Sequence, residues 1–165
     1  MPNTTPVFRA FTIKANGLAN QLRTDATVLY NGKHLTVPAL WDTGATGTCI
    51  SENVVSALGL IPTGMQNIQT PNGKSSVNTY LIDIGLPNGV GIRDVRVCDS
   101  KIGDQGLGVL IGMDIIVNGD FSISNYNGKT VFTFRTPSKQ ITDYVQQITI
   151  ENAIGYKHGR GKRKK

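Results

Sequence analysis

Three of the six Asn-Gly dipeptides in this 165-residue chain constrain its fold more than any other feature of its sequence. They lie at residues 31–32, 72–73 and 127–128. Asn-Gly favours the two-residue turn of an antiparallel hairpin, because both central residues of that turn need a positive φ angle. Apolar, strand-forming residues flank the first pair at residues 26–30 and 35–40. The sequence therefore predicts a mainly β fold.

Three further segments have patterns that predict secondary structure. Residues 51–58 (SENVVSAL) predict a short helix, with Ser51 as its N-cap and Gly59 as its stop. Residues 109–111 (VLI) form an apolar run of the length of a buried strand. Residues 144–150 (YVQQITI) suit one more strand, with a helix as the alternative that the pattern leaves open.

The composition predicts one folded domain with a different kind of segment at each end. With 39% apolar and 17% charged residues, the chain has the composition of a globular domain. We expect residues 1–20 to be a flexible N-terminal arm, residues 21–154 to be the folded domain and residues 155–165 to be a basic, disordered tail. The net charge of +6 belongs to that tail, because residues 157–165 hold six Lys or Arg and no acid. The alternatives for such a tail are a weak electrostatic contact with nucleic acid or with acidic lipid, and a solubilising end without a partner.

Cysteine and histidine usage predicts neither a disulfide framework nor a metal site. Cys49 and Cys98 are too few for such a framework and lack metal-ligand spacing, so we expect buried thiols in a reducing compartment. His34 and His158 have no cysteine or acid at ligand spacing. The chain has no apolar run of membrane-spanning length and no signal-peptide pattern. We therefore expect a cytoplasmic protein with no cofactor, no metal and no membrane contact.

Residues 39–45 (ALWDTGA) are the segment with the clearest chemical meaning. They place Asp42 directly after an apolar strand, where a carboxylate must be partly desolvated. Proteins tolerate such a charge where it is hydrogen-bonded, shared or used in chemistry. Thr43 supplies a hydroxyl for a local network, and Gly44 lets a backbone or a substrate approach closely. Taken alone, the Asp-Thr-Gly string also fits an ordinary turn.

The segment with Asp42 and Ala45 resembles the active-site motif of the retropepsins, the aspartic proteases of retroviruses and LTR retrotransposons, and of their bacterial relatives. A second segment, residues 109–116 (VLIGMDII), is similar to the apolar-apolar-Gly segment that precedes a short helix in this family. The resemblance covers roughly residues 22–135. It implies a mainly β, retropepsin-like closed barrel with one or two short helices and a homodimeric active site.

The resemblance also assigns roles to individual positions. By that resemblance the glycine of the second segment packs behind the active-site loop, and the hairpin between the two segments is the flap that covers the substrate. The positions so assigned are Asp42 as the catalytic residue, Thr43, Gly44, Ala45 and Gly112 as its support, and Pro71, Asn72 and Gly73 as the flap.

The sequence departs from the retroviral pattern at two positions. Thr46 and Met113 stand where retroviral enzymes have an acid and an arginine that form an ion pair. Both partners are absent together, so no charge is left unpaired. Asp114, the next acid, begins a short helix by resemblance, and an acid there is favourable without any chemistry.

The expected chemistry requires two copies of the chain. Hydrolysis of this type uses two carboxylates around one water, with one ionised and the other protonated. The chain has only one Asp-Thr/Ser-Gly string, so we expect a homodimer in which Asp42 meets its symmetry mate and an extended peptide is the substrate. Residues 144–150 are our candidate for the dimer sheet. The alternatives are a catalytically silent dimer that binds peptides or recruits nucleic acid, and a zymogen whose residues 1–20 block dimerisation.

Overall fold

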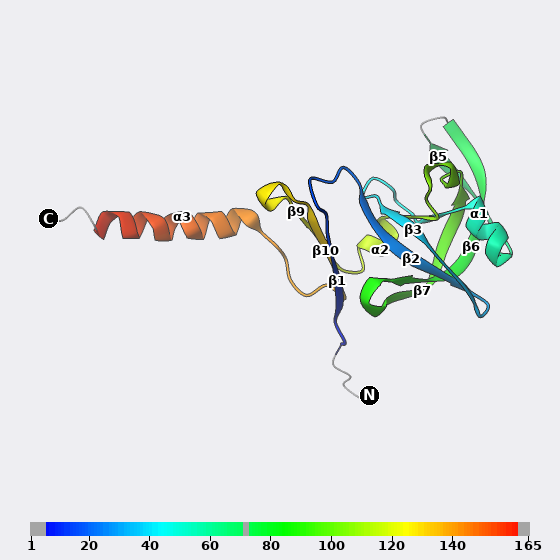
Figure 1. Cartoon of the computed structure of the whole chain (residues 1–165), viewed down its shortest axis with the longest axis horizontal. Helices are drawn as coiled ribbons and strands as arrows, with labels where there is room; N and C mark the ends of the chain where they lie inside the picture. Colours follow the sequence, from blue (N-terminus) through cyan, green and yellow to red (C-terminus); the bar gives the residue numbers. More distant parts are fainter. Residues whose placement is uncertain (1–5, 71–72, 162–165) are drawn as a thin grey trace.

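A computed structural model describes residues 6–70 and 73–161 of the chain, and these residues form two β-sheets and three α-helices (Figure 1). The strands are β1 (Arg9–Lys14), β2 (Leu22–Tyr30), β3 (Lys33–Trp41), β4 (Cys49–Ser51), β5 (Gly64–Thr70), β6 (Gly73–Leu86), β7 (Val90–Ser100), β8 (Val109–Ile111), β9 (Asp120–Ser124) and β10 (Val131–Thr136). The helices are α1 (Glu52–Leu58), α2 (Met113–Ile116) and α3 (Tyr144–Gly161).

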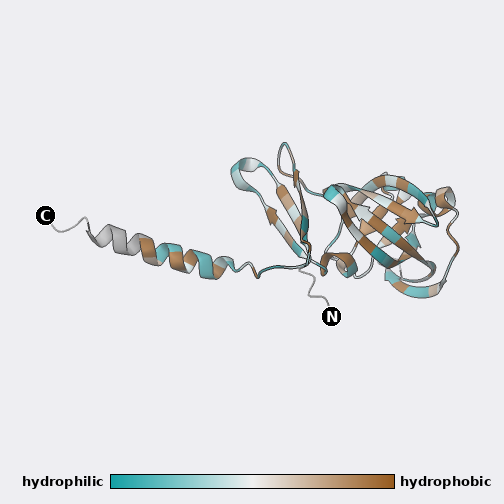
Figure 2. Ribbon diagram, turned by 90° about the horizontal axis from the view of Figure 1, so that it is seen from below, coloured by the Kyte–Doolittle hydropathy of each residue, from teal (hydrophilic) through white to brown (hydrophobic). Residues whose placement is uncertain are grey.

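The larger sheet closes into a barrel. Its strand order is β2-β3-β8-β4-β7-β6-β5, and β2 pairs again with β6 at the other end, for example between Thr27 and Gly85. Six strands therefore form a closed ring, and β5 extends from β6 as the outer strand of a hairpin. Apolar and polar residues alternate along these strands (Figure 2). Since alternate side chains point to opposite faces of a strand, the apolar ones form the buried core of the barrel. The predicted mainly β, closed-barrel fold is confirmed.

The hairpins predicted from the Asn-Gly pairs are present. Residues 31–32 connect β2 to β3 with φ angles of 46° and 75°, and residues 127–128 lie between β9 and β10 with φ angles of 52° and 69°. The hairpin of β5 and β6 pairs in register up to Thr70 and Gly73. Asn72, of the remaining Asn-Gly pair, lies outside the described residues. In the two described turns, the backbone conformation is the one that Asn-Gly favours.

Helix α1 begins and ends where its sequence predicts. The Ser51 hydroxyl accepts a hydrogen bond from the Val54 amide at 3.3 Å, and Gly59 ends the helix in the left-handed conformation with φ 65°. Val54 and Leu58 are the buried residues of the helix, so one face of α1 covers the barrel.

The N-terminal residues are not the flexible arm that we expected, because residues 9–14 form β1. This strand pairs in register with β10, for instance Phe11 with Phe134 and Ile13 with Phe132, and the side chain of Phe11 is buried. With β9 it completes the smaller sheet, in the order β1-β10-β9, which lies between the barrel and α3 (Figure 1). The apolar alternation of Phe11 and Ile13 was the signal for this strand.

Trp41 joins the smaller sheet to the barrel. Its indole Nε1 donates a hydrogen bond to the Thr24 hydroxyl at 3.0 Å, and its side chain is buried. Four phenylalanine rings surround the indole, with centroids 5.2–5.9 Å away. Those rings belong to Phe11, Phe121, Phe132 and Phe134. Because all four come from the strands of the smaller sheet, this aromatic cluster is the contact through which that sheet packs on β3.

Residues 144–150 form a helix, the alternative that their sequence pattern left open, and not a strand. Asp143 supplies the N-cap of α3, since its carboxylate accepts a hydrogen bond from the Gln146 amide at 3.1 Å. Every described side chain from Pro137 to Ile154 is exposed, and α3 projects away from both sheets (Figures 1 and 2). The helix continues to Gly161, so the predicted disordered tail is wrong for residues 155–161, while residues 162–165 lie outside the described part.

None of the helices in the described ranges is long and apolar enough to cross a membrane.

Asp120 holds the segment that follows β10. Its carboxylate accepts hydrogen bonds from the Arg135 guanidinium at 2.8 Å, from the Lys139 amide at 2.9 Å and from the Ser138 hydroxyl. These donors, with the Ser138 hydroxyl contributing most, hold the pKa of Asp120 well below its ordinary value. The start of the linker to α3 is therefore fixed to the edge of the smaller sheet.

Removing one ring of the aromatic cluster should weaken the packing of the smaller sheet on the barrel and so destabilise the fold. We expect Phe134→Ala to lower the free energy of unfolding by about 3–5 kcal/mol, because the fully buried ring leaves a cavity. Phe8, which is 43% exposed, is the matched control, and Phe8→Ala should change stability by less than about 1 kcal/mol. Urea denaturation of both variants measures the difference. Equal losses would contradict the assigned role of the cluster.

Candidate active site

Asp42 lies at the ends of two parallel strands. β3 and β8 run side by side with Trp41 opposite Ile111, and the Asp42 amide donates a hydrogen bond to the Ile111 carbonyl at 2.9 Å. Beyond this point the two segments separate: β3 continues into the loop of residues 42–48, and β8 continues through Gly112 into α2. The half-buried Asp42 therefore lies directly beyond the paired ends of β3 and β8.

The loop folds back on the Asp42 carboxylate. The Gly44 amide donates a hydrogen bond to Asp42 Oδ1 at 2.8 Å, and the Ala45 amide donates to the Asp42 carbonyl at 3.2 Å. A side chain at Gly44 would place its Cβ 3.2 Å from the same carboxylate oxygen, so the turn is tight enough to favour glycine. Thr43 and Gly44 are exposed. A ligand or a second chain therefore has access to this side of the carboxylate.

Gly112 lies directly behind this loop. A Cβ atom on Gly112 would stand 2.6 Å from the carbonyl carbon and oxygen of Gly47 and 3.0 Å from the Ala45 oxygen. Only glycine allows this approach without moving the backbone. The next amide, that of Met113, donates to the Ala45 carbonyl at 2.8 Å. The structure thus brings together the two segments that the sequence places 70 residues apart, from Asp42 to Gly112.

Asp114 does more than begin a helix. Its carboxylate accepts two hydrogen bonds from Thr48, one from the amide at 2.9 Å and one from the hydroxyl at 2.7 Å. The Thr48 hydroxyl in turn accepts from the Gly112 amide at 3.1 Å, and the Asp114 amide donates to the Thr46 carbonyl at 3.2 Å. Sequence reasoning missed this pair, because helix position alone explained Asp114 and nothing in the sequence singled out Thr48.

The hairpin of β5 and β6 lies beside a groove of about 820 Å³. The groove is bordered by this hairpin, by the start of α1 and by residues 99–105. Asp99 fixes one wall, since its carboxylate accepts hydrogen bonds from Asn78 and from the Tyr80 hydroxyl at 3.0–3.1 Å. Burial, followed by the Asp99 carboxylate, raises the pKa of the Tyr80 hydroxyl. Of the expected flap residues, Gly73 begins β6, and Pro71 and Asn72 lie outside the described residues.

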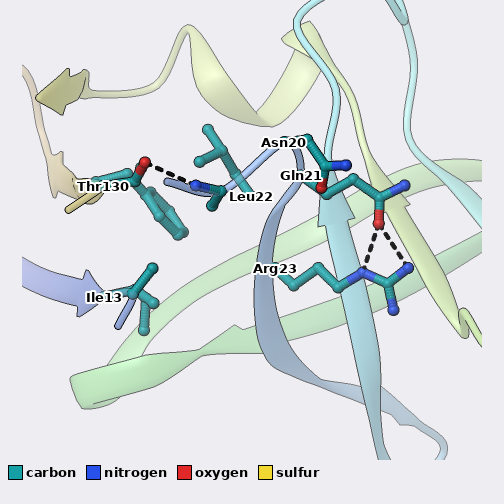
Figure 3. Close-up of a pocket in the computed structure, with 9 residues that line it drawn as sticks. Ile13, Asn20, Gln21, Leu22, Arg23 and Thr130 are labelled. Carbon is teal, nitrogen blue, oxygen red and sulfur yellow. Dashed lines mark hydrogen bonds between the residues drawn. The ribbon is translucent and has the colours of Figure 1, made fainter. Parts of the chain in front are cut away.

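A second pocket, of about 290 Å³, lies between β1, β10 and the start of β2 (Figure 3). Thr130 forms one side, and its hydroxyl accepts a hydrogen bond from the Ala19 amide at 2.9 Å. Arg23 forms the other side and donates to the Gln21 side chain at 2.7–2.9 Å. Arg23 is the pocket's only charged side chain, and Asp42 lines neither this pocket nor the groove beside the β5–β6 hairpin.

The described part of the chain has no cluster of three His, Cys, Asp or Glu side chains that could hold a metal ion.

Removing the Asp114 carboxylate should loosen the loop that carries Asp42. We expect Asp114→Ala to lower the free energy of unfolding by about 1–3 kcal/mol, because the Thr48 amide and hydroxyl lose their acceptor. Asp114→Asn keeps one acceptor oxygen and should lose less. Urea denaturation followed by circular dichroism measures both variants. An unchanged unfolding midpoint for Asp114→Ala would show that the contact does not stabilise the loop.

Comparison with known structures and families places this site in context. A retropepsin-like aspartic protease from Rickettsia conorii has a similar fold, with a TM-score of 0.52 at 13% identity over 81% of this chain and 98% of that one. The simian foamy virus protease is 21% identical over 56% of this chain and 89% of its own, with a TM-score of 0.40. No curated protein matches the chain in sequence.

The family match covers more than half of the sequence. Residues 26–118 match the model of the gag-polyprotein putative aspartyl protease family. The matched segment includes both Asp42 and Gly112, which belong to the two segments that meet at the loop described above. The chain therefore belongs to the gag-polyprotein putative aspartyl protease family.

Proposed function

We propose that this chain is an aspartic endopeptidase that hydrolyses peptide bonds with a water molecule activated between Asp42 and Asp42 of a second copy. The observation that carries the proposal is the placement of Asp42. Its carboxylate is half-buried, is oriented by the Gly44 amide at 2.8 Å and lies in a loop with exposed neighbours. Family membership gives this arrangement its chemical meaning.

The reaction uses the two carboxylates in different protonation states. One is ionised and takes a proton from the water as the water attacks the carbonyl carbon, while the protonated one donates a hydrogen bond to the carbonyl oxygen. The resulting tetrahedral species breaks down when the amide nitrogen receives a proton and leaves. Two carboxylates that flank one water share a single proton. Because one of them must be protonated, activity should be highest in mildly acidic solution. Gly44 supports the reaction by holding Asp42 Oδ1 in a fixed orientation.

The homodimer is part of this proposal. One Asp-Thr-Gly string supplies one carboxylate, and a two-fold axis beside Asp42 supplies the second from identical residues. The smaller sheet suits the interface better than residues 144–150, which are helical. Its outer strands, β1 and β9, each have one edge without a partner strand in the described structure, and such edges pair readily with another chain. Trp41 stacks on Phe121 of β9, so this sheet lies close to the Asp42 loop.

The groove beside the β5–β6 hairpin is the proposed site for an extended peptide. Extended substrates bind through backbone hydrogen bonds and through pockets for alternate side chains. The hairpin supplies a strand edge in β5, and Met65 and Ile68 contribute apolar surface to the groove. Gly73 and its neighbours at the hairpin tip are proposed as the flap over the bound peptide.

Asp42→Asn tests the catalytic role. We expect the variant to fold normally and to lose about 10²–10⁴-fold in kcat, because the amide can neither accept nor share the proton. Cleavage of casein and of a peptide library from acidic to neutral pH measures the change. The control is Asp25→Asn, which removes an exposed carboxylate on β2 and should leave cleavage unchanged. Equal cleavage by wild type and Asp42→Asn would exclude the proposal, and no cleavage by a folded, dimeric wild type would favour a peptide-binding role.

A mixing experiment tests whether two chains build one site. An equal mixture of wild type and Asp42→Asn should lose about half of the activity per wild-type chain, since random pairing puts half of those chains in one-carboxylate dimers. Sedimentation velocity of each protein checks that both form dimers. An unrelated inert protein at the same concentration is the control. Activity that stays proportional to the wild type added would show that single chains are active.

A further inference from the structure

Two cysteines that lie far apart in the sequence meet in the barrel wall. Cys49 on β4 and Cys98 on β7 are direct partners in the parallel pairing of these strands. Their Sγ atoms are 3.1 Å apart, and both thiols are free. The sequence indicated only two unrelated buried thiols.

The backbone places this pair within reach of a disulfide. Neighbouring strands lie about 4.8 Å apart, and disulfides join Cα atoms separated by about 4.4–6.8 Å. The sulfur atoms need to approach each other by only about 1 Å to reach bonding distance. Rotation of the two side chains can supply that movement without a shift of either strand.

The surroundings favour a reactive thiolate near neutral pH. The Cys49 thiol hydrogen-bonds to Cys98 and lowers the pKa of Cys98 to about 7, against the opposing effects of burial and of Asp99. The same contact, together with burial, Asp114 and Asp99, raises the pKa of Cys49. The two groups therefore share a proton and ionise as a pair. Cys98 is buried, whereas Cys49 is half-exposed and provides the approach for a reagent.

The pair lies at a narrow junction of the barrel. Three residue pairs join β4 to β7, and the other neighbour of β4, β8, pairs with it at two positions. One side of this junction leads through Thr48 to the Asp42 loop, and the Cys98 amide donates to the Thr48 carbonyl at 3.3 Å. The other side leads through β7 to β6 and the hairpin. A covalent bond here would tie the loop to the hairpin half of the barrel.

We propose that Cys49 and Cys98 form a redox-active dithiol that a small-molecule disulfide converts into an intramolecular disulfide across the β4–β7 junction. With a disulfide as oxidant, a thiolate of the pair attacks it and forms a mixed disulfide with release of one thiol. The second cysteine then attacks the protein sulfur and releases the other thiol. The pair loses two protons and two electrons, and the oxidant becomes two thiols. This inference does not depend on the proposed proteolysis.

The test is oxidation of the full chain by oxidised glutathione, followed by denaturation, alkylation with iodoacetamide and measurement of the intact mass. Reduced wild type should take up two alkyl groups. Oxidised wild type should take up none, carry no glutathione and run as a single chain on a non-reducing gel, and dithiothreitol should restore both thiols. Two alkylatable thiols after treatment, a glutathione on each cysteine or a bond between chains would each overturn the proposal.

Cys49→Ser and Cys98→Ser are the matched controls, since each retains one thiol and can only form a mixed disulfide. Hydrogen exchange then checks the structural consequence. Backbone amides of residues 49–51 and 98–100 should exchange more slowly in oxidised wild type than in reduced wild type, with no such change in either treated variant. Unchanged exchange in oxidised wild type would overturn the inference that the bond fixes the junction.

Discussion

The close contact between Gly112 and the backbone of residues 45–47 is the constraint on which the candidate active site depends. It requires a residue without a side chain at the end of β8 and brings the first amides of α2 against the loop carbonyls. The Thr48–Asp114 hydrogen bonds close the same contact from the other side. Backbone and side-chain hydrogen bonds therefore both join the loop to the start of α2. The position of Asp42 depends on these two segments and not on the loop alone.

Much of the fold could be predicted from short-range patterns. Asn-Gly at residues 31–32 specifies its turn through backbone conformation, and Ser51 and Gly59 bound α1 through local hydrogen bonds, so neighbouring residues contain the information. The same holds for the strand at 109–111. The packing of Gly112 behind the Asp42 loop was expected from family resemblance, since no local rule links segments so far apart in the chain.

The errors and omissions concern features that only tertiary contacts decide. The apolar alternation in β1 is too short to specify a strand by itself, and the strand is stabilised by the packing of Phe11 on Trp41, which belongs to the other sheet. Residues 144–150 fit both secondary structures, and the Asp143 cap decides for the helix because no strand edge pairs with the segment in the described structure. The Thr48–Asp114 and Cys49–Cys98 contacts could not be predicted either, because each joins two segments that meet only in the folded barrel.

The place of Trp41 has a spectroscopic consequence. It is the only tryptophan of the chain, it is buried among four phenylalanine rings, and it directly precedes Asp42. When the indole is excited selectively, its emission reports the polarity of one defined position, the contact between the barrel and the smaller sheet. Intrinsic fluorescence therefore follows the hydration of that contact, next to Asp42, without an added label. Because the chain has one tryptophan, the signal is not an average over several indoles.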